Sequence, residues 1–343
     1  GHCHTKVVAA IRDQITKLIH VPNNFYHLQQ AKLAKEIIRN AFPGKVFFCN
    51  SGTEGVEAAI KPARAYGKDS RYEIITMEKS FHGRTLGSLA ATGQLKYKDG
   101  FHPLPAGFNM VPFNDITALK NAINEKTVAV MLELIQGEGG VNIIEKKYLK
   151  ELREICEKKD ILLIFDEVQT GMGRTGEIFA FKHFGIKPDI MVLAKALGGG
   201  LPIGALVVKN DIADTFKPGM HASTFGGNPL ACKAALGTFT AIFQEKMLKN
   251  SREMGKYLLK ELEKLKRKHS CILAIRGIGL MIGIELKMDG KSVYDECLEN
   301  GLIINCTQGT ILRIMPALNV TKKQADKAIH ILDKSLENIT KVG

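Results

Sequence analysis

The sequence predicts an α/β fold in which helices cover both faces of a mostly parallel sheet, followed by a smaller α+β region. Two observations predict this fold. Apolar runs of strand length recur between helical patterns, and they are unbroken instead of alternating with polar residues, which is typical of strands buried on both faces. These runs lie at residues 46–49, 72–77, 128–134, 161–166, 190–194 and 205–208.

The pattern changes near residue 251. Residues 251–268 carry an apolar stripe at helical spacing, formed by Met254, Leu258, Leu262 and Leu265, and short strands are expected within 278–286, 301–306 and 311–316. A final helix is predicted to start at Lys322. We therefore expect a remnant of an N-terminal segment at 1–24, a large domain at 25–250 and a small carboxyl-terminal domain at 251–343.

Composition excludes several classes of protein. The 343 residues contain no apolar run long enough for a membrane span and no secretory leader, so we expect a cytoplasmic protein that does not bind membranes. Seven scattered cysteines without a CxxC pair argue against disulfides and thiolate metal sites. The net charge of +13 comes from lysines spread over helix faces, which disfavours nucleic acid as a partner.

The first strand is followed by Asn50-Ser51-Gly52-Thr53-Glu54 and a helical pattern. Ser51 or Thr53 can cap that helix, Gly52 lets the backbone approach a ligand, and the free N–H groups of the helix favour a phosphate. An ordinary N-cap with a capping glutamate explains the same residues. The absence of a GxxxxGK[ST] pattern excludes a nucleoside-triphosphate loop.

Two acids, Asp166 and Glu167, end the strand at 161–166, and a GxGxxG pattern follows at 171–176. The pattern matches a dinucleotide site in letters but fails in context, because five residues, 166–170, separate the apolar part of the strand from the first glycine. Either acid can be a structural carboxylate or a functional group.

Lys195 ends the strand at 190–194 and is followed by small residues and three glycines, which would let a bulky ring approach the backbone. A lysine that only extends to solvent is the alternative. A phosphate site, a carboxylate for a pyridinium nitrogen and a lysine for an aldehyde, each after a strand, together favour pyridoxal phosphate as the cofactor.

The sequence here resembles the class III aminotransferases of fold type I, of the ornithine and acetylornithine type. The resemblance covers the whole chain, and its motifs are NSGTE at 50–54, SFHGRT at 80–85, IQGEGG at 135–140, FDEVQTGMGRTG at 165–176, AKALGGG at 194–200 and STFGGNPLAC at 223–232.

The resemblance implies roles for individual residues. Lys195 would bind the cofactor aldehyde as a Schiff base, and Asp166 would face the ring nitrogen. The other cofactor-binding residues would be Ser51, Gly52 and Thr53 at the phosphate, Phe81 stacked on the ring, Val168, Gln169 at the phenolic oxygen, and Thr224 reaching the phosphate of the neighbouring subunit. A homodimer with shared active sites is therefore expected.

The resemblance also implies substrate contacts. Arg84 would bind the distal carboxylate, Arg313 the α-carboxylate of glutamate with Glu138 as its partner, and Ser223 would lie near the substrate. Simpler explanations are a core position for Phe81, a surface ion pair for Arg84 and a structural pair between Arg313 and Glu138. No metal is expected, because the GHCH stretch at 1–4 resembles one that binds none in the family.

The implied reaction moves the δ-amino group of N2-acetylornithine to 2-oxoglutarate. Alternatives within the family are ornithine, succinylornithine, succinyldiaminopimelate or 4-aminobutyrate as amino donor, or a glutamate-semialdehyde aminomutase; a catalytically dead binding protein is a further alternative. The chain begins inside the GHCH stretch, so we expect a truncated N-terminus. Pro62 predicts a kink or an early end in the helix after NSGTE.

Overall fold

The largest of three sheets has seven strands in the computed structural model, which describes residues 1–342. Their order is β1 (Gly44–Cys49), β9 (Gly204–Lys209), β8 (Ile190–Leu193), β7 (Leu162–Asp166), β4 (Thr127–Leu132), β2 (Glu73–Met77) and β3 (Phe108–Val111). β9 runs antiparallel to both neighbours, whereas the pairings from β8 to β3 are parallel. The predicted α/β class with a mostly parallel sheet is therefore confirmed.

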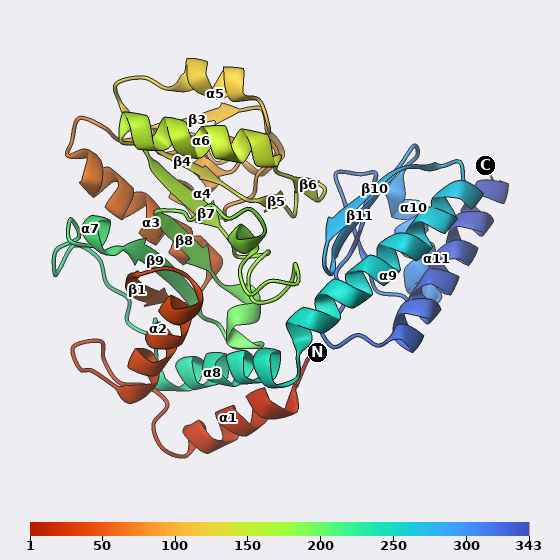
Figure 1. Ribbon diagram of the computed structural model, residues 1–343, viewed down its shortest axis with the longest axis horizontal. Helices are drawn as coiled ribbons and strands as arrows, with labels where there is room; N and C mark the ends of the chain where they lie inside the picture. Colours follow the sequence, from red (N-terminus) through yellow and green to blue (C-terminus); the bar gives the residue numbers. More distant parts are fainter. Residues whose placement is uncertain (343) are drawn as a thin grey trace.

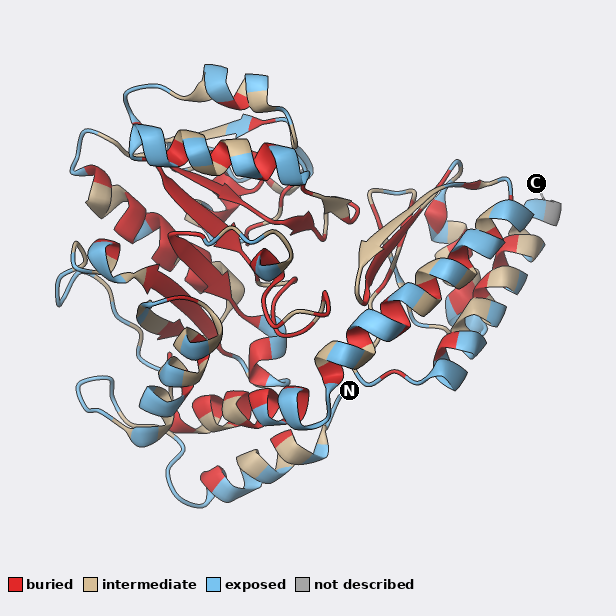
Figure 2. Ribbon diagram, in the orientation of Figure 1, coloured by how far each residue is buried: buried red, intermediate tan, exposed pale blue. Residues whose placement is uncertain are grey.

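Helices cover both faces of this sheet (Figures 1 and 2). α3 (Gly52–Gly67) packs on one face, and α2 (Leu28–Asn40), α6 (Lys146–Lys159) and α8 (Pro229–Gln244) pack on the other. Alternate side chains of a strand point to opposite faces, so Leu162 and Ile164 of β7 join the first core and Leu163 and Phe165 join the second. Burial on both faces explains the unbroken apolar runs.

The smaller body holds a four-stranded antiparallel sheet in the order β10 (Ile272–Ile278), β11 (Met281–Leu286), β13 (Ile311–Ile314), β12 (Asn305–Thr307). It packs against α9 (Met247–Lys268), α10 (Gly290–Glu299) and α11 (Lys322–Val342). The stripe of Met254, Leu258, Leu262 and Leu265 is buried in this core, as its spacing predicted. α9 extends from the larger body into the smaller one (Figure 1).

Shorter elements complete the chain: α1 (Thr5–Ile15), which packs on α8, α4 (Leu86–Ala91), α5 (Ile116–Ala122), α7 (Asn210–Ala213), β5 (Ile135–Gln136), β6 (Asn142–Ile143) and 3-10 turns at Leu95–Tyr97, Ala180–His183 and Lys195–Gly198. The expected early end of the helix at Pro62 is wrong. α3 continues to Gly67, and Pro62 itself is buried within the helix. Apolar contacts of Ile60 and Ala63 on either side hold the helix together there.

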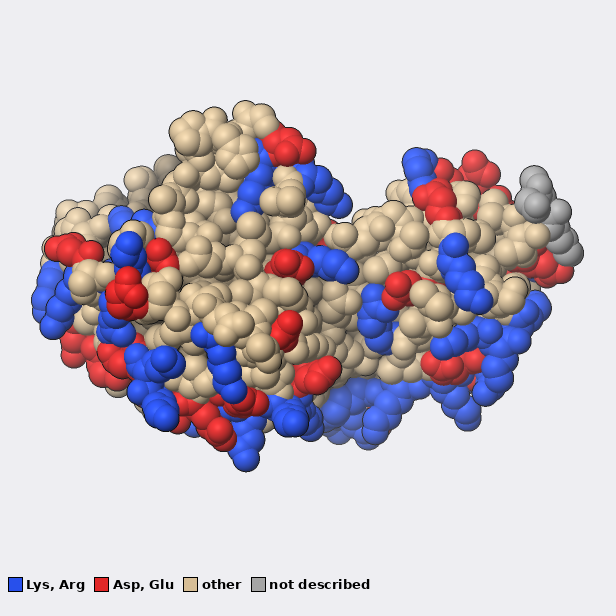
Figure 3. All heavy atoms as spheres, turned by 90° about the horizontal axis from the view of Figure 1, so that it is seen from above, with Lys and Arg blue, Asp and Glu red and all other residues tan. Residues whose placement is uncertain are grey.

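The surface carries mixed charge. On the face seen in Figure 3, acidic groups lie among the basic ones over much of the molecule. Several helical lysines pair with an acid one turn away, for example Lys264 with Glu261 and Lys322 with Asp326. Within residues 1–342, no helix is both long and apolar enough to cross a membrane.

The parallel strands β1, β2, β4, β7 and β8 have their carboxyl ends at the same edge of the larger sheet, where ligand sites of open α/β sheets form. The motifs singled out in the sequence follow these strands, so this edge is where the functional groups meet.

Candidate active site

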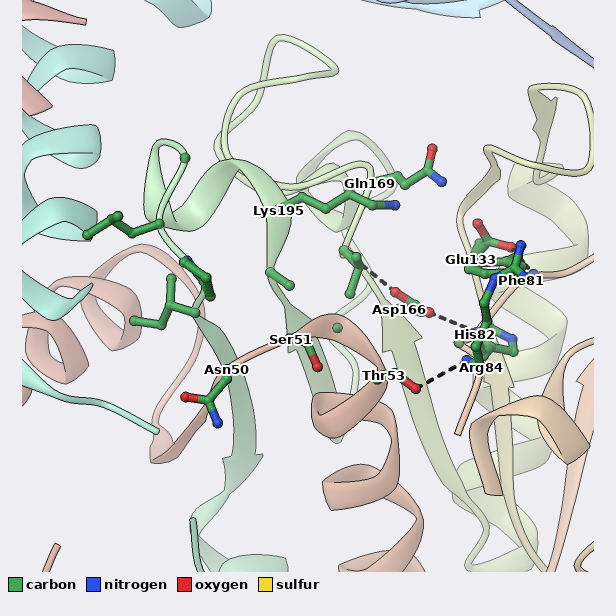
Figure 4. Close-up of a pocket in the computed structure, with 18 residues that line it drawn as sticks. Asn50, Ser51, Thr53, Phe81, His82, Arg84, Glu133, Asp166, Gln169 and Lys195 are labelled. Atoms are coloured by element: carbon green, nitrogen blue, oxygen red, sulfur yellow. Dashed lines mark hydrogen bonds and ion pairs between the residues drawn. The ribbon is translucent and has the colours of Figure 1, made fainter. Parts of the chain in front are cut away.

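A cavity of about 480 Å³ lies at the carboxyl edge of the larger sheet (Figure 4), within the size range of small-molecule sites. Its walls come from the loops after five strands and from the segment that leads into β9. The lining residues are Asn50, Ser51, Gly52, Thr53, Phe81, His82, Gly83, Arg84, Glu133, Asp166, Val168, Gln169, Ala194, Lys195, Gly200, Leu201, Pro202 and Ile203.

Lys195 extends from the end of β8 across this cavity toward Gln169 (Figure 4). Its backbone has φ 45°, a left-handed conformation that is uncommon outside glycine and that is often found at functional sites. Solvent reaches the side chain, but burial among the cavity walls still lowers the pKa of its amine, against the opposing effect of Asp166, Glu133 and Glu138. A lowered pKa makes the neutral, nucleophilic amine more accessible.

Asp166 ends β7 at the floor of the cavity, where it is 4% exposed. Its Oδ1 accepts a hydrogen bond from the N–H of Val168 at 3.0 Å, and its Oδ2 lies 2.8 Å from Nδ1 of His82. Burial alone would lower the pKa of His82, but the hydrogen bond and charge of Asp166 outweigh burial and raise it. The contact with Asp166 therefore favours a protonated His82.

His82 and Glu133 both line the cavity, and sequence reasoning assigned neither. Glu133 accepts hydrogen bonds from the N–H groups of Phe81 at 3.0 Å and Gly137 at 3.2 Å, and burial raises its pKa to about 7. Signals were present for both. His82 lies inside SFHGRT, and Glu133 directly follows the strand at 127–132, as Asp166 ends its own strand.

The start of α3 forms another wall. Ser51 is the N-cap, and its Oγ accepts from the N–H of Glu54 at 3.3 Å. The side chain of Thr53 is held by Thr85 at 2.9 Å and Ser88 at 2.7 Å, so its hydroxyl points into this polar cluster. The N–H groups of the first helical turn have no acceptor within the helix, which leaves an anion site at Gly52 and Thr53.

Phe81 and Arg84 form the wall after β2. Phe81 is half-buried and lines the cavity, so it is not a core residue. Tyr97 packs edge-on against it with ring centroids 5.5 Å apart. The guanidinium of Arg84 lies over both rings, at 5.0 Å from the Tyr97 centroid and 5.8 Å from that of Phe81, and the Arg84 side chain is exposed. Within the described residues, Arg84 has no acidic partner.

Arg313 on β13 lies beside the cavity and comes from the smaller body. Its Nη1 donates to Oε1 of Glu138 at 2.9 Å and to Oε1 of Gln169 at 3.2 Å, and Gln169 also donates to Glu138 at 3.0 Å. Burial would raise the pKa of Glu138, but Arg313 and Gln169 lower it overall. These residues line an adjoining space of about 320 Å³, which shares Lys195, Val168 and Gln169 with the cavity.

Ser223 and Thr224 lie in a different part of the structure from the residues described so far. Both line a separate hollow of about 370 Å³ beside Asn50 and Glu54, and Thr224 is exposed. Ser223 accepts hydrogen bonds from the Asn50 side chain at 3.3 Å and the N–H of Gly226 at 3.0 Å. Neither residue lines the cavity that holds Lys195 of the same chain.

The GxGxxG segment at 171–176 forms a series of turns in which Met172, Gly173 and Gly176 have positive φ. A dinucleotide site needs this pattern to open a helix directly after a strand. The segment begins no helix, so it lacks that context.

The family-level comparison agrees with this arrangement. Residues 1–336 match the family of class III aminotransferases. The chain belongs to that family, and it is a pyridoxal-phosphate-dependent transaminase, as the motifs predicted.

Individual relatives are similar along almost their whole length. The acetylornithine aminotransferase of Methanocaldococcus jannaschii is 52% identical over 99% of this chain and 87% of its own, and that of Caldanaerobacter subterraneus is 50% identical with the same coverage. A solved ornithine aminotransferase from Toxoplasma gondii, described with partial occupancy of pyridoxal phosphate at its active site, matches with TM-score 0.95 and 33% identity over 99% of this chain and 84% of its own.

The cavity fits pyridoxal phosphate. Lys195 has no hydrogen-bond partner among the described residues, so its amine is free to react. A Cβ at Gly52 would lie 3.0 Å and 3.2 Å from the methyl groups of Val168, so only glycine lets the helix start come this close to that wall. Asp166 supplies a buried carboxylate, and Val168 and Phe81 supply apolar surfaces for a flat ring.

Proposed function

We propose that this chain transfers the δ-amino group of N2-acetylornithine to 2-oxoglutarate, giving N-acetylglutamate 5-semialdehyde and glutamate. Support comes from relatives at 44–52% identity that carry the name acetylornithine aminotransferase and cover nearly the full chain. The geometry of two arginines supports the same substrate pair.

The two arginines approach the cavity from different bodies, Arg84 from the loop after β2 and Arg313 from β13. N2-acetylornithine reacts at an amine far from its carboxylate, whereas glutamate reacts at the amine beside its α-carboxylate. One cation cannot serve both positions. We assign Arg84 to the distal carboxylate and Arg313 to the proximal one, with Glu138 neutralising Arg313 while the acetylornithine chain is bound. This pair of cations is the observation that carries the proposal.

The residues of the chain have distinct tasks in the reaction. Bound pyridoxal phosphate supplies an electron sink that stabilises a carbanion at the substrate carbon. Lys195 would hold the cofactor aldehyde, and its amine, once the substrate amine has taken its place there, would move a proton at the substrate carbon. Asp166, held in place by its hydrogen bond with His82, would face the ring nitrogen of the cofactor and hold a proton there. The N–H groups at Gly52 and Thr53 bind the phosphate.

The assignment is tested by measuring each half-reaction separately in single turnover. A charge-assisted contact in a desolvated pocket contributes about 2 to 5 kcal/mol, so its loss should slow the affected half-reaction about 30-fold or more. Arg313→Ala should impair the glutamate half-reaction and largely spare acetylornithine. Arg84→Ala should impair acetylornithine strongly and glutamate in part. Equal losses for both donors in the Arg313 variant would contradict the division of roles.

Stoichiometric consumption of 2-oxoglutarate separates this reaction from that of an aminomutase, which needs no second keto acid. If the wild-type enzyme leaves N2-acetylornithine unchanged but converts another diamine, that diamine is the amino donor instead.

We further propose a cytoplasmic homodimer. Large apolar side chains are exposed along the N-terminal segment and near Thr224, including Phe25 at 64%, Tyr26 at 103% and Phe225 at 58%. Exposed apolar groups that cluster in this way favour a protein contact. In a dimer, Thr224 would complete the phosphate site of the other subunit. The seven cysteines are all free thiols, which supports a reducing compartment.

A further inference from the structure

Gln308 occupies an unfavourable backbone conformation in the turn between β12 and β13. Its φ is 53°, in the left-handed region that disfavours side chains with a Cβ, and the next residue, Gly309, has φ 75°. Non-glycine residues persist there when surrounding contacts hold them, and such positions cluster at functional sites. The contacts of the Gln308 side chain indicate what it does.

The amide nitrogen of Gln308 donates two hydrogen bonds, to the backbone carbonyl of Glu138 at 2.7 Å and to Oε1 of Gln94 at 2.9 Å. The carbonyl can only accept, so chemistry settles which end of the amide faces it. Thr307 donates to the same carbonyl at 2.6 Å. Both lone pairs of the Glu138 carbonyl are therefore filled by the turn of the smaller body.

The loop that carries Glu138 is also held on either side of this residue, where the Gly137 N–H donates to Glu133 at 3.2 Å and Asn142 donates to the Gly139 carbonyl at 3.0 Å. Gly137 precedes it and Gly139 follows it, and neither position tolerates a side chain. A Cβ at Gly137 would lie 2.1 Å from Oε1 of Gln169, and one at Gly139 would lie 2.6 Å from the carbonyl of Lys79. Flanking glycines widen the range of backbone conformations open to this loop, so the hydrogen bonds of the turn to the Glu138 carbonyl add a restraint at Glu138 itself.

The second partner, Gln94, connects the turn to the wall that carries Arg84. Its amide nitrogen donates to the carbonyls of Lys79 at 3.2 Å and Ser80 at 3.3 Å, directly before Phe81. Gln94 is 6% exposed. Gln308 thus joins the loop of Glu138 to the loop that leads to Arg84.

We propose that Gln308 is a positioning residue that fixes the main chain of Glu138 relative to both substrate arginines. With the main chain held, the carboxylate of Glu138 stays in register with Arg313, 2.9 Å away, and can leave it only by rotation of its own side chain. Gln308 thereby sets the preference between the long amino donor and the dicarboxylate. This inference rests on the proposed function.

Two substitutions of Gln308 remove its amide donor but differ in their effect on the backbone. Gln308→Glu keeps the side-chain length and the backbone preference, whereas Gln308→Gly also removes the steric cost of the left-handed conformation. Both should lower kcat/KM for N2-acetylornithine about 3- to 10-fold, the effect of losing the hydrogen bond that holds the Glu138 carbonyl, mainly through KM. Both should leave the Kd for glutarate, a dicarboxylate with the carbon spacing of 2-oxoglutarate, unchanged or lower, because Arg313 is then less firmly paired.

Thermal unfolding separates positioning from stability. Gln308→Glu should lower the midpoint, and Gln308→Gly should lower it less or not at all. Lys68→Gly is the matched control, because exposed Lys68 also has positive φ, at the end of α3, and contacts neither arginine. Lys68→Gly should not lower the unfolding midpoint, and it should leave the KM for N2-acetylornithine and the Kd for glutarate unchanged.

The inference would be overturned if kcat/KM fell only in Gln308→Glu, the variant with the lower unfolding midpoint. It would also be overturned if the variants bound N2-acetylornithine and glutarate more weakly by the same factor. Both readouts need an active enzyme with bound cofactor. If wild type does not convert N2-acetylornithine, the proposed function fails, and the same comparison with the diamine that it does convert still tests Gln308.

Discussion

Lys195 and Asp166 end neighbouring parallel strands, and each depends on a contact that the local sequence does not specify. Lys195 enters the cavity through a left-handed backbone, and Asp166 receives its second hydrogen bond from His82, 84 residues earlier in the chain. The reactivity of these residues is therefore a property of their surroundings, and it can be tested one side chain at a time.

Lys195 should be the residue that carries the cofactor. Reduction of the enzyme with borohydride, followed by peptide mapping, should place pyridoxal phosphate on this lysine, because its amine is unpaired and faces the cavity. Lys195→Ala should show no adduct. Lys209→Ala is a suitable control, since Lys209 pairs with Asp189 outside the cavity and its loss should leave labelling intact. An adduct on a different lysine would refute the assignment.

His82 should contribute pH-dependent stability. Asp166 raises the pKa of His82 in the folded chain, so the folded state holds the proton more tightly than the unfolded state. The contribution is fully present below the unfolded pKa of about 6.5 and is lost as pH rises through the folded pKa. Urea unfolding should therefore show a larger stability gap between wild type and His82→Gln at about pH 6 than at about pH 9. A difference in stability between wild type and His82→Gln that grows with pH would contradict a raised pKa of His82.

At the scale of elements, the start of α3 combines a cap, a ligand site and a tight contact with the loop after β7. Ser51 satisfies one N–H of the first turn, and the glycine that follows allows the approach to Val168. The sequence pattern predicted a helix start there but left open which of Ser51 and Thr53 is the cap.

Gly52→Ala should weaken cofactor binding while sparing the fold. The new methyl group would press on Val168 at 3.0 Å, and overpacking of this kind costs about 1 to 3 kcal/mol. The Kd for pyridoxal phosphate should rise about 5- to 160-fold in a fluorescence titration. The unfolding midpoint without cofactor should fall only in part, because the helix preference of alanine over glycine, worth about 1 kcal/mol, offsets some of the same strain. An unchanged Kd for the cofactor would show that Val168 moves aside without an energetic cost.

Elements with strong burial patterns were predicted from the sequence, and elements without them were missed. The run at 161–166 became β7, buried at each residue, and the run at 205–208 lies within β9. The edge strand β3 and most of β10 gave no apolar run, because half their residues or more are only partly buried. A partly buried strand position accepts polar as well as apolar residues, so such a strand does not form an unbroken apolar run in the sequence.

At the scale of the whole molecule, the position of Thr224 outside its own cavity requires a second subunit if it binds phosphate. Two inactive variants should then complement each other. In a mixed dimer of Lys195→Ala and Thr224→Ala subunits, one site would combine intact Lys195 with intact Thr224 from the partner.

That site should recover the wild-type affinity for pyridoxal phosphate, and light scattering should show a dimer throughout. Thr224→Ala homodimers, measured alone, are the control and should bind the cofactor more weakly, because a phosphate contact is lost. No recovery in the mixed dimer, or an active monomer, would place Thr224 in a purely local role.

The sequence alone determined the α/β class, the cofactor class and the strand ends that carry Lys195 and Asp166. Burial on two faces and a motif tied to one chemistry both leave their mark in local residue order. Tertiary structure alone decided the contacts between distant segments: His82 against Asp166, Glu133 in the wall, and Gln308 holding the carbonyl of Glu138. Such contacts depend on how loops from different strands and from the two bodies meet in space, and no period or spacing in one segment records that meeting.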